Sequence, residues 1–261
     1  MTQENLQELE TQGYTIVRNV IPDNWYSSLS IAMDKAFAHH RAIQIENGND
    51  IKTDGVALHA VLSDPMLLEV LYYLVETGFI KSLEENFFKS KAILNSFSAL
   101  NNLPKQPNFS SIIHRDLRFY SGEFPMMLNC LIMVDKFTIE NGGTYLLPGS
   151  HLAEYKPSPE EFYEEAVQAT GNTGDILVFN ANVWHASAPN NTDLDRKALP
   201  FTISKSFMKQ LLDYPRAFGY EKMHTFTEDM QQFLGYYSRV PASLDEWYQP
   251  EDKRFYKKNQ D

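Results

Sequence analysis

The chain has 261 residues, which is enough for one sizeable hydrophobic core, and no segment has the composition of a linker. Its 34 acidic residues outnumber its 23 basic residues, and the net charge of −11 argues against nucleic acid or an anionic membrane surface as the main partner. The single cysteine, Cys130, excludes an internal disulfide, a zinc finger and a CxxC redox site.

The N-terminus has neither the basic segment nor the apolar segment of a signal peptide. The longest apolar run, residues 126–134, is about half as long as a membrane-spanning helix must be. We therefore expect a soluble, cytoplasmic protein without a membrane partner. We also expect a single domain over residues 1–261, with helices at the N-terminus and a helical segment at the C-terminus, while the oligomeric state stays open.

Helical signals dominate the first 90 residues. Residues 25–41 carry apolar side chains at spacings of three and four, which places them on one stripe of a helix. Asp64 and Pro65 are the residue types of a helix cap and a first helical turn, and Gly78 is suited to end that helix. We predict helices at 4–11, 25–41, 65–77 and 79–88, and a first strand at 13–17.

The segment after the first long helix is polar. Residues 43–56 contain two glycines, and we interpret them as a loop that could fold over a site. His59, just beyond this loop, is a candidate substrate contact, although its position is not fixed by the sequence. His39 and His40 are adjacent and cannot share one helix face, so we expect them to be exposed rather than to bind metal.

Short strand-like runs dominate the chain from residue 92 onward. Residues 126–134 are a continuous apolar run of strand length, as in a strand buried on both faces. Asn129 interrupts this run, so its amide must either pin the backbone or face a pocket. Residues 199–203 alternate apolar and polar side chains. We predict further strands at 92–100, 144–147 and 176–179, a capped surface helix at 159–169, and helical pieces at 227–233 and 243–247.

The order of these elements favours a mainly β fold with flanking α-helices. Helices followed by many short strands, separated by glycine and proline turns, are typical of an antiparallel double-sheet barrel or jelly roll with the helices outside. A parallel α/β sheet fits less well, because helices do not alternate with strands between residues 90 and 205. In a jelly roll, residues from separate strands can face one interior.

A histidine and a carboxylate lie two residues apart in His114-Arg115-Asp116. If this segment is extended, both side chains leave the same face and can hold one ion. His185, 71 residues beyond His114, offers a second imidazole. Two histidines and one carboxylate leave three positions of a metal open, which is the arrangement of non-haem Fe(II) oxygenases. On spacing alone, a histidine paired with a nearby carboxylate is the commoner arrangement.

Several motifs occur together in the chain: His114-Arg115-Asp116, Asn141-Gly142-Gly143-Thr144, Leu147-Pro148-Gly149-Ser150-His151, Gly174-Asp175, His185 and Arg196. In this combination they resemble the phytanoyl-CoA dioxygenase family. Its members are Fe(II)- and 2-oxoglutarate-dependent oxygenases with a double-stranded β-helix fold. The likeness spans nearly the whole chain, including the opening strand and the closing aromatic segment.

The resemblance implies a metal centre. His114, Asp116 and His185 would bind Fe(II), for which imidazole and carboxylate are suitable ligands. The implied reaction consumes O2 and 2-oxoglutarate, hydroxylates an unactivated C–H bond of a small-molecule metabolite, and releases succinate and CO2. Asp116 argues against halogenation, because related halogenases lack a carboxylate at this position. Desaturation and ring formation remain alternatives, and the substrate stays open.

The resemblance also implies the cosubstrate site. Arg196 would hold the far carboxylate of 2-oxoglutarate in a bidentate pair that a lysine cannot form. By itself, however, the segment 193–197 looks like an exposed charged turn. Ser187 and Thr144 would offer hydroxyl groups to the same cosubstrate. His151 lies outside the implied ligand set, and we expect it to be structural.

Two other functions remain open. A non-catalytic jelly-roll protein could keep the metal site for structure, although it would have no chemical reason to keep Arg196 as well. A cupin-like isomerase or lyase would also need no arginine clamp and usually has more histidines at its metal. Serine hydrolase and P-loop functions are not indicated, because neither Gly-x-Ser-x-Gly nor Gly-x4-Gly-Lys occurs.

The sequence gives few signals for substrate choice. Arg118 could meet an acidic or phosphate-bearing substrate, but a salt bridge to Glu123 is the commoner outcome for such a residue. We expect the loops at 43–60 and 101–111 and the C-terminal segment to select the substrate. Loops of this kind carry no transferable code, so the substrate class is not predicted.

Overall fold

Two antiparallel sheets form the centre of the protein in the computed structural model, which describes residues 1–49, 55–106, 111–257 and 260. The larger sheet has, in spatial order, β1 (Tyr14–Val17), β8 (Ile176–Asn180), β5 (Met127–Met133), β10 (Arg196–Lys205), β4 (Ala99–Asn102) and β2 (Val56–Ala57), and β3 (Ala92–Phe97) also pairs with β10. The smaller sheet has β7 (Val167–Gln168), β6 (Tyr145–Leu146) and β9 (His185–Ala186).

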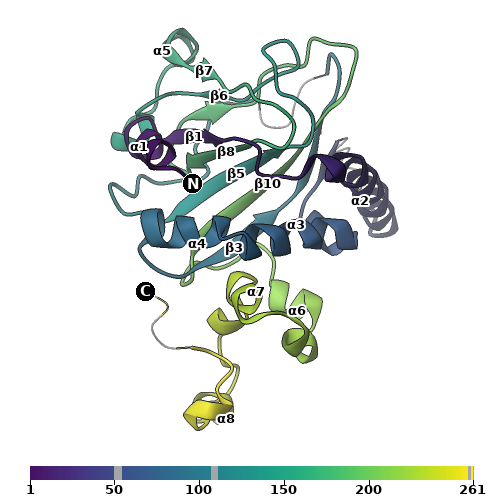
Figure 1. Ribbon diagram of the computed structural model, residues 1–261, viewed down its shortest axis with the longest axis vertical. Coiled ribbons are helices and arrows are strands. Elements are labelled where there is room, and N and C mark those ends of the chain that lie inside the picture. Colours follow the sequence, from purple (N-terminus) through teal and green to yellow (C-terminus); the bar gives the residue numbers. More distant parts are fainter. Residues whose placement is uncertain (50–54, 107–110, 258–259, 261) are drawn as a thin grey trace.

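Helices cover the outside of the larger sheet. Figure 1 shows the smaller sheet on one side of the larger sheet and most of the helices on the other. The helices are α1 (Gln3–Thr11), α2 (Tyr26–Glu46), α3 (Pro65–Glu76), α4 (Phe79–Leu83), α5 (Pro159–Glu165), α6 (Tyr214–Phe218), α7 (Glu228–Phe233) and α8 (Leu244–Trp247). None of the helices in the described part of the chain is long and apolar enough to cross a membrane.

Both faces of the larger sheet are buried. Along β5, Leu128, Cys130 and Ile132 belong to the core between the sheet and the helices. Leu131 and Met133 point the other way, into the core between the two sheets. A strand with two buried faces reads as a continuous apolar run, which explains residues 126–134. The predicted jelly roll with helices packed outside is therefore confirmed.

Local signals set the ends of the helices that support the sheet. The side chain of Asp64 accepts a hydrogen bond of 2.9 Å from the backbone N–H of Met66, and Pro65 occupies the first turn of α3. Leu67, Leu71 and Leu74 of this helix are fully buried. The predicted cap and the predicted apolar face therefore act together to hold α3 against the sheet.

Some element boundaries differ from the sequence prediction. The helix predicted at 25–41 continues to Glu46, because no glycine or proline interrupts it before Gly48. The helix predicted at 159–169 ends at Glu165, because the next residues pair with β6 as strand β7. Of the loops predicted to select the substrate, residues 50–54 and 107–110 lie outside the described residues.

The run predicted as one strand at 92–100 is divided into β3 and β4. Both pair with β10, whose register shifts between Thr202 and Ile203. Ser98, between the two strands, donates its backbone N–H to the carbonyl of Pro200 at 2.8 Å. Pro200 has no N–H to donate in return, so the ladder is interrupted here, although the register against β10 is the same on both sides of the break.

Candidate metal centre and the cavities beside it

His114, Asp116 and His185 lie together at one end of the space between the sheets. Their ligand atoms are all within 4.8 Å of one another. The Asp116 carboxylate is 3.5 Å from Nε2 of His114 and 3.7 Å from Nε2 of His185. The segment of His114 is an isolated bridge rather than a continuous strand: His114 and His185 exchange two backbone hydrogen bonds of 3.0 Å. This pair of bonds fixes the spacing of the two imidazoles.

Backbone carbonyls orient both imidazole rings. Nδ1 of His114 donates to the carbonyl of Ile112 at 2.7 Å, and Nδ1 of His185 donates to the carbonyl of Val183 at 3.0 Å. A carbonyl only accepts, so Nδ1 carries the hydrogen in each ring and Nε2 of the neutral ring has a free lone pair. When both rings are neutral, two lone pairs and a carboxylate thus converge on one point. A cation at their centre turns this repulsive arrangement into an attractive one.

The protein environment affects the three groups differently. The pKa of His185 is lowered, mainly because the ring is buried, and Asp116 offsets only part of that effect. Burial also acts to lower the pKa of His114, but the carboxylate of Asp116 and the carbonyl of Ile112 together raise it. Burial acts to raise the pKa of Asp116, and the two histidines outweigh it, so this pKa is lowered. The acid is therefore ionised at neutral pH and His185 is neutral, as metal ligands must be.

A cavity of about 240 Å³ leads from these residues into the jelly roll. Its far wall contains Arg196, which is only 1% exposed. Nη2 of Arg196 donates to the carbonyl of Gly142 at 2.8 Å, and the guanidinium lies 4.0 Å from the centre of the Phe137 ring. Nε has no hydrogen-bond partner, and no carboxylate of the described chain forms an ion pair with this side chain. Burial lowers the pKa of Arg196 to about 10, so it remains a cation at neutral pH.

The position of Arg196 depends on the turn at residues 141–143. Gly142 has a φ of +88°, and a Cβ at this position would stand 2.3 Å from Nδ2 of Asn102 and 2.5 Å from the carbonyl oxygen of Ala188. Only glycine fits this turn, which brings the carbonyl of Gly142 to the guanidinium. The interpretation of residues 193–197 as an exposed turn is thus wrong for Arg196, which begins β10 and points inward.

Further polar side chains line the same cavity. Thr144 and Ser187, the two predicted hydroxyl contacts, both lie on its wall. Asn129 also lines it, with the side chain 5% exposed and Nδ2 without a hydrogen-bond partner. Ser96 and Thr202 complete this polar part of the wall and share a hydrogen bond of 2.8 Å. Sequence reasoning missed the last two, although the alternation along 199–203 places Thr202 opposite the apolar face.

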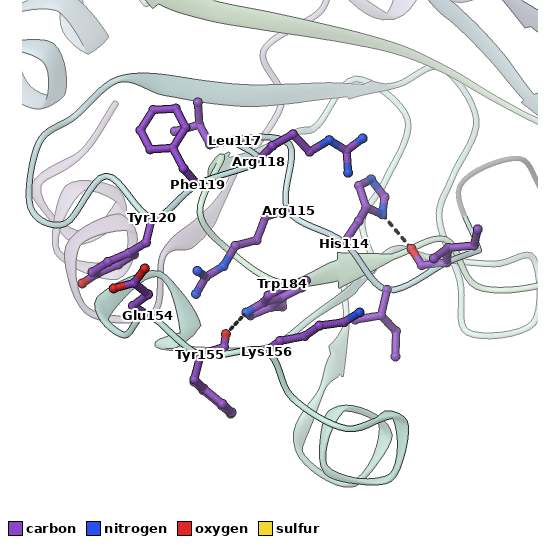
Figure 2. A pocket seen from close by; sticks show the side chains of 12 residues that line it. His114, Arg115, Leu117, Arg118, Phe119, Tyr120, Glu154, Tyr155, Lys156 and Trp184 are labelled. Carbon is purple, nitrogen blue, oxygen red and sulfur yellow. Dashed lines mark hydrogen bonds between the residues drawn. The ribbon is translucent and has the colours of Figure 1, made fainter.

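A second cavity, of about 560 Å³, opens on the other side of His114 and is shown in Figure 2. Arg115 forms part of its wall rather than of the metal cluster: it donates to the carbonyls of Ser150 and Ala153, both at 2.6 Å. Its guanidinium also lies 4.7 Å from the centre of the Trp184 ring. Sequence reasoning assigned no role to Arg115 or Trp184, since the cavity between them depends on tertiary structure alone.

Other flagged residues lie away from these cavities. Nδ1 of His59 is 2.9 Å from the hydroxyl of Tyr214, and His59 is not among the residues that line either cavity. His40 contacts Ser63. His151 donates from Nε2 to the carbonyl of Glu10 at 3.0 Å, which fits the structural role expected for it.

Comparison with known proteins identifies the family. Residues 9–198 match the family model described as phytanoyl-CoA dioxygenase. The chain belongs to the phytanoyl-CoA dioxygenase family. An uncharacterized protein of Mycobacterium tuberculosis is 31% identical over 262 residues, which cover 97% of this chain and 93% of the relative. The dioxygenase sphC of Aspergillus fumigatus is 28% identical over 156 residues, which cover 57% of this chain and 42% of that enzyme.

Solved structures with a similar fold include two enzymes from nogalamycin biosynthesis. The non-heme alpha ketoglutarate dependent carbocyclase SnoK from nogalamycin biosynthesis has a TM-score of 0.59 at 17% identity, over 78% of this chain and 84% of SnoK. The epimerase SnoN, in complex with Fe3+, alpha ketoglutarate and nogalamycin RO, has a TM-score of 0.58 at 17% identity, over 78% of this chain and 84% of SnoN. At this identity the likeness concerns the fold.

Proposed function

We propose that this protein is an Fe(II)- and 2-oxoglutarate-dependent dioxygenase. It would hydroxylate an unactivated C–H bond of a small-molecule metabolite and release succinate and CO2. The observation that carries this proposal is a single cavity with two unlike ends. One end has two imidazoles and a carboxylate, and the other has a buried guanidinium that has no carboxylate partner among the described residues. Membership of a dioxygenase family and the iron and alpha ketoglutarate in SnoN support it.

The donor set at the first end fits Fe(II). His114 and His185 each present a lone pair on Nε2, and Asp116 presents an ionised carboxylate. Three ligands on one side leave three positions for other groups, and neutral imidazole with carboxylate suits ferrous iron. When bound, the iron supplies the activation of O2 that side chains cannot provide. The side chains of His114, Asp116 and His185 are 20%, 33% and 9% exposed, so other groups can approach the metal from the cavity.

The second end fits the far carboxylate of 2-oxoglutarate. The planar guanidinium of Arg196 can form two parallel hydrogen bonds with it, and its buried charge would then be compensated. Thr144 and Ser187, on the same wall, would contact the same carboxylate. Asn129 offers an N–H donor that has no partner and would meet a polar atom of a bound molecule. Phe137 and the surrounding core keep water away from the guanidinium.

The side chains and backbone of the protein thus position the metal ligands, orient the cosubstrate and exclude water. The carbonyls of Ile112 and Val183 keep both histidines in the tautomer that binds a metal. The carbonyl of Gly142 and the ring of Phe137 hold the guanidinium at the cavity wall before the cosubstrate arrives. Asp116 occupies the position at which a halide would have to bind, which favours hydroxylation over halogenation.

Anaerobic titration with Fe(II) and 2-oxoglutarate tests this function. We expect a visible absorption band from the bidentate chelate, and slow succinate release once air is admitted. Asp116→Ala should abolish both, because the metal loses one of three ligands, while the circular dichroism spectrum stays unchanged since the side chain is partly exposed and not part of the core. Asp116→Glu is the matched variant that keeps the charge. Normal succinate release by Asp116→Ala would contradict the assignment.

A further inference from the structure

Two positively charged side chains in the second cavity do not stabilise the fold through a hydrogen bond or an ion pair with another described residue. Arg118 and Lys156 both line this cavity of about 560 Å³. Both are exposed, and neither forms a hydrogen bond or an ion pair with another described residue. The alternative of a salt bridge from Arg118 to Glu123 is not formed. Figure 2 shows the guanidinium of Arg118 on the same side of the cavity as His114.

These charges stand out against the rest of the protein. The chain has a net charge of −11, yet the lining of this cavity includes three cations and only one acid, Glu154. Arg115 is the third cation, and its guanidinium is already used by two carbonyls and the ring of Trp184. A positive field confined to one cavity of an acidic protein concentrates small anions there.

The neighbouring metal centre does not use these charges. In the proposed function, Asp116 binds the metal, and the far carboxylate of 2-oxoglutarate is neutralised by Arg196 in the other cavity. Arg118 follows Asp116 by two residues, and its positive charge acts on His114, Asp116 and His185. It is therefore a cation beside the centre that remains without a counter-ion after metal and cosubstrate have bound.

Most of the remaining wall of the cavity is aromatic or aliphatic. Trp184 is fixed by a hydrogen bond of 2.6 Å from Nε1 to the carbonyl of Tyr155, and by the guanidinium of Arg115 over its ring. Phe119 is 57% exposed and Tyr155 is 45% exposed, although both are large aromatic residues. A rigid apolar wall next to free cations is complementary to a molecule with an apolar body and an acidic group.

We infer that the substrate is an amphipathic organic acid whose carboxylate or phosphate group binds Arg118, with Lys156 adding a second positive charge and the aromatic wall holding the apolar body. This inference rests on the proposed function for the reaction, but the binding it describes requires only the second cavity. Because His114 lines both cavities, a molecule bound in the second cavity would lie beside the metal centre.

The test is calorimetric titration of the protein loaded with Mn(II) and saturated with 2-oxoglutarate, so that the metal and Arg196 are already occupied. Three probes share one chain length: octanoate, octyl phosphate and octanamide. We expect at least one acid to bind about tenfold more tightly than the uncharged amide, as a charge-assisted hydrogen bond would give. The ratio of octanoate to octyl phosphate affinity distinguishes a carboxylate from a phosphate substrate.

Arg118→Gln, alone and combined with Lys156→Gln, should reduce the affinity for the acid about tenfold and leave that for octanamide unchanged. Arg216→Gln is the matched control, because Arg216 is an exposed arginine on α6, in the C-terminal part of the chain. Equal affinities for acid and amide in the wild-type protein, including no binding by any probe at millimolar concentration, would overturn the inference. An acid preference that survives in the double variant would also overturn it.

The two proposals fail in distinguishable ways. The affinity of each variant for Mn(II) and 2-oxoglutarate is measured before the acids are added. If 2-oxoglutarate does not bind, the proposed function fails, and the acid titration is then carried out on the metal-free protein, where the same preference is expected. If 2-oxoglutarate binds and the acid preference is absent, only the inference about the substrate fails.

Discussion

A buried guanidinium without an ion pair costs free energy, and Arg196 is in this situation, although the charge of Asp135 acts on it from farther away. The carbonyl of Gly142 and the ring of Phe137 compensate part of the cost, but Nε remains without a partner. The positive charge of Arg196 is thus only partly compensated, and a carboxylate of a bound dicarboxylate would compensate it. An uncompensated guanidinium and a cluster of metal-binding side chains lie in one cavity. At the scale of single residues, this combination is what favours the proposed function over other functions of a metal site.

Arg196→Gln should raise the Kd for 2-oxoglutarate about 10- to 100-fold, because charge-assisted hydrogen bonds of about 1.5–3 kcal/mol are lost. The measurement is anaerobic titration of the Fe(II) protein, followed by the visible band. Lys197→Gln is the matched control: Lys197 is the next residue of β10, points to the opposite face of the sheet and donates to Asp34 of α2 at 2.6 Å. Equal Kd values for both variants would count against the role of Arg196.

At the scale of elements, the metal ligands lie on short bridged segments, whereas the long strands form the cavity wall. His114 and His185 are joined by one isolated bridge, and β9 has only two residues. The longer strands β5 and β10 do not supply metal ligands; they supply the cavity wall, including Asn129 and Arg196. The turn at residues 141–143 then joins the two parts, because Gly142 contacts the guanidinium.

Gly142→Ala tests this connection. The added Cβ would overlap Asn102 and the carbonyl of Ala188, and φ is +88°, so we expect a loss of about 2–4 kcal/mol in the free energy of unfolding. Displacement of the Gly142 carbonyl should also weaken 2-oxoglutarate binding. Gly48→Ala is the matched control, because Gly48 has a φ of +67° but nothing within 4 Å of the added atom.

Chemical denaturation measures both glycine variants. Gly48→Ala should lower the free energy of unfolding by only about 1–2 kcal/mol, the cost of a positive φ for alanine, and should keep the affinity for 2-oxoglutarate. If the two variants lost equal stability, the tight packing around residues 141–143 would not contribute, and the proposed coupling between turn and guanidinium would be wrong.

Elements were predictable from the sequence where local signals agree with tertiary packing. The cap at Asp64 and the apolar run at 126–134 gave α3 and β5 almost residue for residue. The break between β3 and β4 was not predictable, because it lies opposite Pro200 of β10, which has no N–H to donate and is about 100 residues away in the sequence. Likewise β7 was hidden, since Val167 and Gln168 become a strand only by pairing with β6.

The candidate site followed the same rule. The residues of the metal cluster were marked by spacing and family likeness, and the structure brings them within 4.8 Å. Arg196 was marked by family likeness alone, because its neighbours in sequence are charged and polar while its burial comes from β5 and the turn at 141–143. Arg118 was marked only as one of two alternatives, and Lys156 and Trp184 were not marked, since a cavity between distant loops leaves no local pattern.

At the scale of the whole molecule, positively charged side chains line two separate cavities of an acidic protein. The surface is acidic overall, while one cavity ends in Arg196 and the other contains Arg118 and Lys156. The first cation is buried and holds a dicarboxylate deep in the jelly roll in our proposal. The other two are exposed and, in the same proposal, bind a larger acid in the second cavity, so that the two ligands do not compete for one site.

This arrangement makes the stability of the fold depend on metal and cosubstrate together. A ligand that binds only the folded state at 100 times its Kd adds about 2.7 kcal/mol to the free energy of unfolding, which for a domain of this size raises Tm by roughly 5–10 °C. We expect Mn(II) with 2-oxoglutarate to raise Tm by about this amount, and 2-oxoglutarate alone to raise it much less, because only one end of the molecule is then held. Thermal unfolding of the wild-type protein, with Asp116→Ala as the variant that lacks the metal, measures the difference. The same shift with and without Mn(II) would mean that the metal cluster and Arg196 do not hold one cosubstrate between them.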